Sequence, residues 1–179
     1  MGVMNEKTGL IHIYFGNGKG KTTAGMGLCA RAAGYGYKVL IYQFMKDNTT
    51  SERNILKCSE NITILDGLEQ EKFSSSLTEE ERRERRIFYT RQFQEAVQQA
   101  ERGYDVLFLD EVIYTIQAGL LDEEIVTDYL EKKPEHLEVI LTGNSPSSKL
   151  IEAADYVSEI KKIKHPFDSG QCARKGIEL

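Results

Sequence analysis

The chain has 179 residues, of which 40% are hydrophobic and 28% are charged, and its formal net charge is −5. A chain of this length can bury roughly 70% of the surface that its unfolded form exposes, which predicts one domain over residues 1–179 with a full hydrophobic core. The acidic balance argues against a dedicated nucleic-acid-binding protein, because the surface of such a protein is usually basic.

The start of the chain predicts a strand, a tight loop, a helix and a second strand. The mostly apolar run 10–15 predicts the first strand, and residues 21–33 favour a helix that Gly34 and Gly36 would end. The β-rich run 38–44 predicts a parallel strand that is buried on both faces.

The middle of the chain predicts a weak strand, a loop and a long helix. Residues 62–65 are the strand candidate, and the polar stretch 67–77 predicts a loop of the kind that often carries function. Thr78 and Glu81 have the spacing of a capping box, which opens a charged helix that Gly103 can end. The expected apolar stripe of this helix consists of Ile87, Phe93, Val97 and Ala100.

The last part of the chain predicts three more strands and a short helix. The strands are expected at 105–109, 137–141 and 156–163. Between the last two, Ser145 as the cap and Pro146 at the first helical position predict the start of the helix.

The alternation of strands and helices predicts an α/β fold with an open, doubly wound, mostly parallel sheet, as in P-loop NTPases. In such a sheet the ligand site lies along the edge formed by the carboxyl ends of the strands. Glycine-rich and acidic residues follow several of the predicted strands, so we expect the site at that edge.

A glycine-rich loop joins the first strand to the first helix, with the sequence Gly16-Asn17-Gly18-Lys19-Gly20-Lys21-Thr22. Small residues let consecutive backbone N–H groups converge on phosphate oxygens at a helix N-terminus. Lys21 adds a positive charge beside the phosphates, Lys19 adds a second, and the Thr22 hydroxyl is placed to bind Mg²⁺. The loop therefore predicts a nucleoside triphosphate site. A glycine-rich turn that binds nothing is the alternative, which the flanking strand and helix disfavour.

The spacing of this loop departs from the usual phosphate loop. The usual pattern is G-x-x-x-x-G-K-[ST], whereas residue 15 is Phe and the first glycine is Gly16, so the loop is one residue short. We expect the shortening to carry information about the reaction.

Asp110 and Glu111 follow an apolar strand, where sheets of this kind place acidic groups that face the phosphate loop and hold Mg²⁺ or its waters. The two residues are therefore predicted partners of Thr22. In a hydrolytic ATPase an acidic residue at this place orients the attacking water instead, so the pair leaves hydrolysis and group transfer open. For each residue, capping of the following helix is a further alternative.

The loop from Gly16 to Thr23, followed by Ala30-Arg31-Ala32 and Gln43-Phe44, resembles the ATP:cob(I)alamin (corrinoid) adenosyltransferases that have a P-loop fold. The resemblance covers about residues 10–179. Further matches occur in the family's order, namely Leu109-Asp110-Glu111 with Tyr114, Leu141-Thr142-Gly143, Lys164-His165-x-Phe167-Asp168-x-Gly170 and Gly176-Ile177.

The resemblance implies that the 5′-deoxyadenosyl group of ATP is transferred to the cobalt(I) of a corrinoid, with release of inorganic triphosphate. The corrinoid would be cobalamin or cob(I)yrinic acid a,c-diamide, in cobalamin biosynthesis or salvage. Because displacement at the ribose 5′-carbon makes the whole triphosphate the leaving group, its growing charge needs cations already in place. Cobalt(I) is a powerful nucleophile, so no side-chain base is required and positioning carries most of the catalysis.

The resemblance also implies roles for individual residues. Lys21 and Glu111 would be catalytic, and Thr22, Glu111 and Asp110 would hold Mg²⁺. Arg31 would contact the nucleotide, and His165 and Asp168 would lie near the nucleotide or the corrinoid. The loop residues that would bind the nucleotide are Gly16, Asn17, Gly18, Lys19, Gly20, Lys21, Thr22 and Thr23.

The loop before the capping-box helix departs from the family. Members commonly carry a Phe and a Trp there, which ease the reduction of cobalt by removing its axial ligand. Here Phe73 matches the Phe, Ser75 stands where the Trp would fall, and the chain has no Trp. Phe73 is therefore a candidate corrinoid contact, and the alternative is that it merely anchors the loop.

Two other functions stay open on the residues alone. An ordinary P-loop ATPase or kinase would use Lys21, Thr22 and the acidic pair and would make ADP. A regulatory module would bind ATP or a corrinoid without turnover, which the missing Trp suggests.

The sequence also gives expectations for the compartment and the partners of the protein. Three widely spaced cysteines, Cys29, Cys58 and Cys172, fit neither a disulfide framework nor a sulfur-rich zinc site. The polar start and the lack of an apolar run of ~20 residues predict no signal peptide and no membrane span. We expect a soluble cytoplasmic enzyme, and the resemblance adds a homodimer and a flavoprotein as electron donor.

Overall fold

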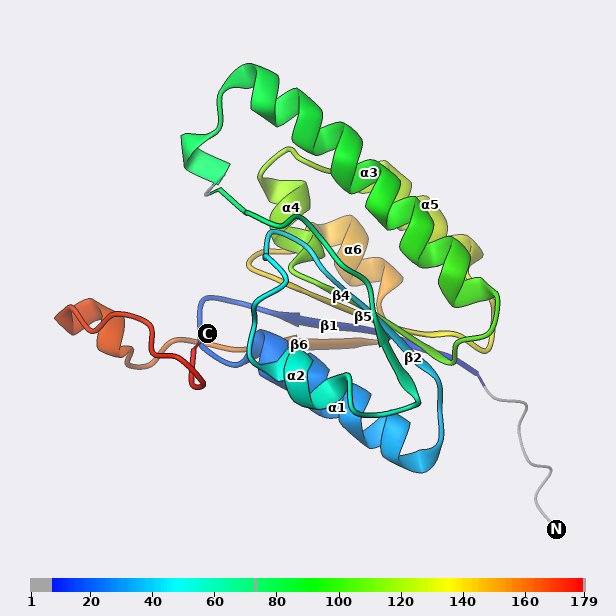
Figure 1. The fold of residues 1–179 in the computed structure, drawn as a ribbon. Helices are drawn as coiled ribbons and strands as arrows, with labels where there is room; N and C mark the ends of the chain where they lie inside the picture. The colour runs from blue at the N-terminus through cyan, green and yellow to red at the C-terminus, as the bar shows by residue number, and fades with distance from the viewer. Residues whose placement is uncertain (1–7, 73, 179) are drawn as a thin grey trace, which may run out of the picture.

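The computed structural model describes residues 8–72 and 74–178, which form one parallel sheet of six strands with helices on both faces (Figure 1). The strand order is β3-β2-β4-β5-β1-β6, and every neighbouring pair is parallel. The strands are β1 Ile11–Phe15, β2 Val39–Gln43, β3 Ile62–Ile64, β4 Val106–Asp110, β5 Glu138–Gly143 and β6 Tyr156–Glu159. The predicted α/β class with an open parallel sheet is confirmed.

The helices divide between the two faces of the sheet. Figure 1 shows α1 and α2 on one face and α3, α5 and α6 on the other. The helices are α1 Lys21–Tyr35, α2 Glu52–Leu56, α3 Glu79–Glu101, α4 Val112–Gln117, α5 Glu123–Lys132 and α6 Ser148–Ala153, with 3₁₀ turns at Ser74–Ser76 and Pro166–Ser169. Among the described residues, no helix is long and apolar enough to cross a membrane.

Each face of the sheet has its own hydrophobic core, and β2 contributes to both. Leu40 and Tyr42 pack into the core under α3 and α5, while Val39 and Ile41 pack into the core under α1. Successive side chains of a strand point to opposite faces, so a strand that is covered on both sides needs an unbroken apolar run. The unbroken apolar run of residues 39–42 is explained by this position.

A close contact between α1 and β4 brings the start of α1 toward the acidic end of that strand. Gly25 in α1 lies so near Phe108 that a Cβ atom on residue 25 would fall 2.4 Å from the aromatic ring. Only a glycine permits this approach. The contact holds α1, whose first residue is Lys21, against the strand that ends at Asp110.

The predicted apolar stripe of α3 is partly wrong. Ile87 is 66% exposed, and the residues that α3 buries against the sheet are Tyr89, Phe93, Ala96 and Ala100. Residues two apart on a helix point to nearly opposite sides. Because Tyr89 faces the core, Ile87 faces solvent. The capping box at the start of α3 is confirmed, since the Thr78 side chain accepts from the Glu81 N–H and the Glu81 side chain accepts from the Thr78 N–H.

Three predicted boundaries also change. The short helix is capped by Ser147 and not by Ser145, because the Ser147 hydroxyl accepts the Leu150 N–H at 3.2 Å. β6 ends at Glu159 and not at residue 163. α1 continues through Gly34 and ends at Tyr35, and Gly36 caps it with a left-handed φ of 107°, which suits a glycine after a helix. The helices α2 and α5 had no counterpart in the prediction, whereas α4 is the helix after Asp110 and Glu111 that the capping alternative assumes.

Candidate active site

The glycine-rich loop lies at the carboxyl edge of the sheet, between β1 and α1. Gly16 and Gly20 have φ values of 116° and 115°, which favour glycine. Gly20 is the N-cap of α1 and supplies no side-chain acceptor to the first turn. The N–H groups there, at the positive end of the helix dipole, are therefore suited to an anion. The Lys21 ammonium donates to the Gly18 carbonyl at 3.0 Å, which holds its side chain over the loop.

The chain segment after β6 supports the phosphate loop. The Gly18 N–H donates to the Ile160 carbonyl at 2.8 Å, and the Asn17 side chain accepts the Lys162 N–H at 2.8 Å. A Cβ atom on Gly18 would lie 2.8 Å from the Ile160 oxygen, so the loop and this segment are in close contact. The shape of the loop thus depends on a segment about 140 residues away, which no local pattern in the sequence indicates.

Asp110, at the end of β4, is completely buried and lies at the centre of a polar cluster. Its Oδ1 accepts hydrogen bonds from the hydroxyl groups of Thr22 at 2.9 Å and Thr142 at 2.7 Å. Its Oδ2 accepts from the Lys46 ammonium at 2.6 Å and the Gln43 amide at 3.2 Å. The structure thus brings Thr22 and Asp110 together with Gln43 and Thr142, which occur in the family matches, and it adds Lys46, which the sequence analysis did not single out.

Lys46 is the residue of this cluster whose charge matters most. Its ammonium also donates to the Thr22 hydroxyl at 3.0 Å. Burial alone would lower the pKa of Lys46, but the charge and the hydrogen bond of Asp110, with the charges of Glu111 and Glu52, raise it above its usual value. Lys46 is therefore a cation at neutral pH.

Glu111 has a backbone conformation that is unusual for a residue with a side chain, with φ of 59°. Its N–H donates to the Thr142 hydroxyl at 2.8 Å, which fixes the turn from β4 into α4. Glu111 occupies the N-cap position of α4, but its side chain makes no capping hydrogen bond. Burial and the neighbouring charge of Asp110 raise the pKa of Glu111, although Lys46 and Lys21 oppose them.

These residues fit a magnesium ion that is shared with phosphate. An ammonium already occupies a cationic position between the Thr22 hydroxyl and the Asp110 carboxylate. In residues 8–72 and 74–178, no group of three or more His, Cys, Asp or Glu side chains could hold a metal ion. Mg²⁺ commonly binds through one or two carboxylates together with waters and substrate phosphates, so a metal here would need the triphosphate as a ligand.

The structure does not bring Arg31 to the phosphate loop. Arg31 follows Lys21 by ten residues in α1, which is about 15 Å along the helix axis. It lines a pocket of about 380 Å³ together with Asp105 and Glu138, at the amino ends of β4 and β5. Arg31 therefore lies toward the opposite edge of the sheet from the loop.

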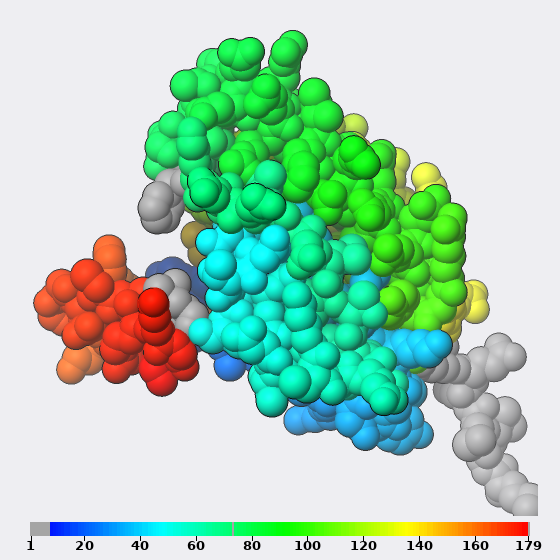
Figure 2. Space-filling view, viewed as in Figure 1, coloured from blue at the N-terminus to red at the C-terminus, as the bar shows by residue number. Residues whose placement is uncertain are grey.

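His165 and Asp168 lie in the C-terminal segment, on the same side of the molecule as the phosphate loop (Figure 1). This segment stands out from the rest of the surface (Figure 2). His165 Nδ1 accepts the Phe167 N–H at 3.2 Å, and Asp168 pairs with Lys162 at 2.9 Å. These contacts are internal to the segment, while Lys162 links it to Asn17 of the loop.

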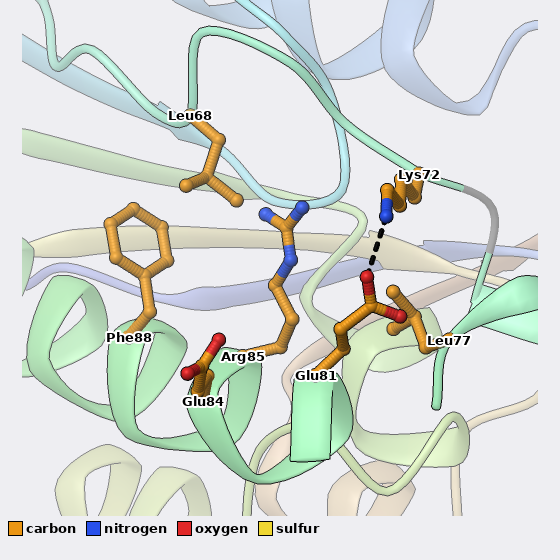
Figure 3. Close-up of a pocket in the computed structure, with 7 residues that line it drawn as sticks. All are labelled: Leu68, Lys72, Leu77, Glu81, Glu84, Arg85 and Phe88. Carbon is orange, nitrogen blue, oxygen red and sulfur yellow. Dashed lines mark hydrogen bonds and ion pairs between the residues drawn. The ribbon is translucent and has the colours of Figure 1, made fainter. Parts of the chain in front are cut away.

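The loop of residues 67–77 lies along the start of α3. Phe73 falls outside the described residues, but both its neighbours are held by side chains. Lys72 pairs with Glu81 across a cavity of about 390 Å³ between this loop and α3 (Figure 3). The Ser74 hydroxyl lies 3.2 Å from the Tyr114 hydroxyl of α4, and the Ser74 carbonyl accepts from Arg82 at 2.8 Å. Because α4 begins just after Glu111, the loop is connected to the acidic end of β4.

The phosphate loop, the acidic end of β4 and the parallel strand order define a P-loop nucleotide-binding protein. Solved structures agree with this class. A KaiC-like protein of Pyrococcus horikoshii superimposes with a TM-score of 0.51 at 18% identity, over 97% of this chain and 76% of that one. EssC (ATPases 2 and 3) of Geobacillus thermodenitrificans superimposes with a TM-score of 0.51 at 16% identity, over 96% of this chain and 35% of that one.

Within this class, the chain belongs to the ATP:corrinoid adenosyltransferase BtuR/CobO/CobP family, whose model matches residues 7–179. Corrinoid adenosyltransferase CobA of Salmonella typhimurium is 35% identical over 179 residues, which are 97% of this chain and 87% of the relative. The corrinoid adenosyltransferase of Escherichia coli K12 is 34% identical over 177 residues, with the same shares. That of Pseudomonas aeruginosa is 30% identical over 178 residues, which are 97% of this chain and 85% of the relative. The predicted family is confirmed.

Proposed function

We propose that the protein transfers the 5′-deoxyadenosyl group of ATP to the cobalt(I) of a corrinoid. The observation that carries this proposal is the short phosphate loop joined to Asp110 through Thr22 in a chain of this family. In the reaction a cobalt–carbon bond forms at the ribose 5′-carbon while the bond from that carbon to the triphosphate oxygen breaks. Both electrons of the broken bond leave with the triphosphate, and the two electrons of the new bond come from cobalt(I).

The phosphate loop would bind the triphosphate and stabilise it as it departs. The N–H groups at the start of α1 and the ammonium of Lys21 lie where phosphate oxygens bind in loops of this kind. Lys19 is exposed on the same loop and adds a second positive charge. Because these groups are in place before the reaction, they stabilise the charge of the leaving group without reorganising.

Mg²⁺ would be held by Thr22, Glu111 and Asp110, and Asp110 would also orient the Thr22 hydroxyl. The Thr22 proton points to Asp110 in the described hydrogen bond, which leaves the oxygen lone pairs for a cation. When bound, the ion supplies positive charge to the triphosphate oxygens. Lys21 and Glu111 are thus the residues that we propose contribute directly to the reaction.

The loop of residues 67–77 is the proposed corrinoid side of the site, with Phe73 as its apolar contact. Ser74 and Tyr114 connect this loop to the start of α4, next to the proposed metal ligand Glu111. His165 and Asp168 would border the same edge from the C-terminal segment. We also expect a cytoplasmic homodimer that receives electrons from a flavoprotein, and we propose these three properties on the resemblance alone.

The test is to give the protein ATP, Mg²⁺ and chemically reduced cobalamin, and to identify both products. Adenosylcobalamin together with triphosphate is the expected result, and Lys21→Ala should lose it. ADP with no adenosylated corrinoid would identify an ATPase or kinase and contradict the proposal. Absence of any turnover of ATP would favour the regulatory alternative.

A further inference from the structure

The polar cluster around Asp110 contains a cation of the protein itself, the Lys46 ammonium. It lies 2.6 Å from Asp110 Oδ2 and 3.0 Å from Thr22 Oγ1. Lys46 follows β2 by three residues, after Met45 with a left-handed φ of 53°. The chain thus turns back from the end of β2, and the ammonium reaches the two residues that are proposed to serve the metal.

The Thr22 hydroxyl uses its proton and one of its two lone pairs in this arrangement. A hydroxyl has one proton and two lone pairs. The Thr22 proton goes to Asp110 Oδ1, and the Lys46 ammonium takes a lone pair of the same oxygen. A magnesium ion that Thr22 helps to hold would use the other lone pair of the same oxygen atom. An ammonium at 3.0 Å from the same atom and a divalent ion so close to it would repel strongly.

The Asp110 carboxylate also needs one cation beside it. Asp110 is completely buried, and a buried carboxylate without a counter-charge is strongly destabilising. Lys46 is the lysine or arginine that pairs with it among the described ion pairs. A cation must therefore remain beside Asp110, but the space between its carboxylate and Thr22 suits one cation at a time.

The two partners differ in their freedom to move. The Asp110 side chain has no exposed surface, whereas the Lys46 side chain is 23% exposed. A lysine carries its charge on a flexible four-carbon stem, so the ammonium can leave toward solvent while its backbone stays in place. Asp110 is held by Thr22, Thr142 and Gln43 and would remain when Lys46 leaves.

We propose that Lys46 is a placeholder cation, which occupies the metal position between Thr22 and Asp110 in the free protein and is expelled when Mg²⁺ binds. The proposal rests on the proposed function only for the place of the metal. Lys46 thus supplies the counter-charge of Asp110 until the ion arrives, while Thr22, Thr142 and Gln43 hold the carboxylate in place. The Lys46 ammonium also competes with the metal, because every metal ion must displace it.

The test measures metal binding without corrinoid or turnover, so it is independent of the transfer reaction. Mn²⁺ serves as the probe, and its free concentration is followed by electron paramagnetic resonance in the presence of inorganic triphosphate, with a protein-free blank at the same triphosphate concentration. Because a competing state weakens apparent binding in proportion to its population, Lys46→Met should bind Mn²⁺ about tenfold more tightly or better. Lys46→Arg keeps the competing charge, so its Mn²⁺ affinity should stay near that of the parent protein. Lys132→Met removes a lysine from an exposed pair on α5 and controls for net charge.

Thermal unfolding provides the second measurement. In buffer with a chelator, Lys46→Met should unfold at a lower temperature than the parent, because Asp110 has lost its cation. Excess Mg²⁺ with inorganic triphosphate should then raise the melting temperature of this variant by more than it raises that of the parent. If the variant folds only when metal is present, that rescue also supports the proposal. Mn²⁺ affinity of Lys46→Met equal to or weaker than that of the parent, or a variant that metal does not rescue, would overturn it.

Discussion

The side-chain hydroxyl of Thr22 donates a 2.9 Å hydrogen bond to Oδ1 of Asp110, across 88 residues of sequence. Thr22 belongs to the first turn of α1 after β1, and Asp110 ends β4. Because both strands are parallel, their carboxyl ends lie at one edge of the sheet. The bond therefore orients the hydroxyl of the phosphate loop from the other side of β5, which lies between β1 and β4.

Replacing Thr22 by valine should abolish metal-dependent ATP binding. Valine has nearly the same shape, but it removes both the hydroxyl that is proposed to bind Mg²⁺ and a donor to the buried Asp110. Loss of one partner of a buried group costs about 1–3 kcal/mol, so the variant should also be less stable. Thr22→Ser keeps the hydroxyl and is the matched control. Titration of ATP with and without Mg²⁺ checks the first effect, and equal Mg²⁺ dependence in Thr22→Val and the parent would contradict it.

Two glycines of α1 should respond to alanine in opposite directions. Alanine at position 25 would place its Cβ 2.4 Å from the Phe108 ring, which forces α1 away from β4 and should cost about 1–3 kcal/mol of stability. At Gly27 a Cβ would meet nothing within 4 Å, and alanine should stabilise the helix by up to about 1 kcal/mol. Denaturant unfolding of both variants measures these changes. A Gly25→Ala protein as stable as Gly27→Ala would show that α1 does not depend on this contact.

Much of the site could be expected from residues that follow predicted strands. Gly-Lys-Thr after β1 and Asp-Glu after β4 are local patterns, and the meeting of Thr22 and Asp110 follows from the geometry of a parallel sheet. Lys46 also follows a predicted strand, just after the Gln43-Phe44 match, but nothing in the local pattern indicates that its ammonium contacts Asp110. Its ammonium reaches Asp110 after a left-handed turn of the backbone at Met45. The position of a lysine head group depends on the path of the backbone before it.

Other parts of the structure could not be predicted from local sequence patterns for similar reasons. The Ile160 carbonyl supports Gly18 through its backbone, and a backbone atom has no signature in the sequence. The predicted apolar stripe of α3 wrongly included Ile87. Most residues of this helix are charged or polar, so few apolar residues indicate which face is buried. The core side chains Tyr89 and Ala96 are recognisable only once the neighbouring sheet is known.

Glu111→Gln should stabilise the metal-free protein at neutral pH. Burial and the charge of Asp110 raise the pKa of Glu111 in the folded state. An acid whose pKa is raised by folding releases its proton more readily when unfolded, so this residue reduces stability as pH rises from its unfolded pKa through its folded pKa. Below that range both states hold the proton, and the parent and the variant should differ little. Above it the variant should be the more stable.

Melting temperatures measured in chelator over a range of pH check this expectation. Glu131→Gln, on the exposed side of α5, is the matched control. Glu111→Gln should also lose metal-dependent activity, because the amide no longer offers a negative charge to Mg²⁺. A stability difference between Glu111→Gln and the parent that does not change with pH would contradict the assignment of a raised pKa.

Tyr114→Phe should weaken the use of corrinoid and leave ATP binding intact. The Tyr114 hydroxyl lies 3.2 Å from the Ser74 hydroxyl, next to the proposed corrinoid contact Phe73, and a hydrogen bond of this kind contributes about 1 kcal/mol. If the bond positions the loop, its loss should raise the KM for reduced corrinoid by about fivefold, with the KM for ATP unchanged. Tyr104→Phe is the control, because it removes a similar bond to Thr63 of 2.9 Å at the opposite edge of the sheet. Equal kinetic effects of the two variants, or a rise in the KM for ATP alone, would show that the loop is not positioned from α4.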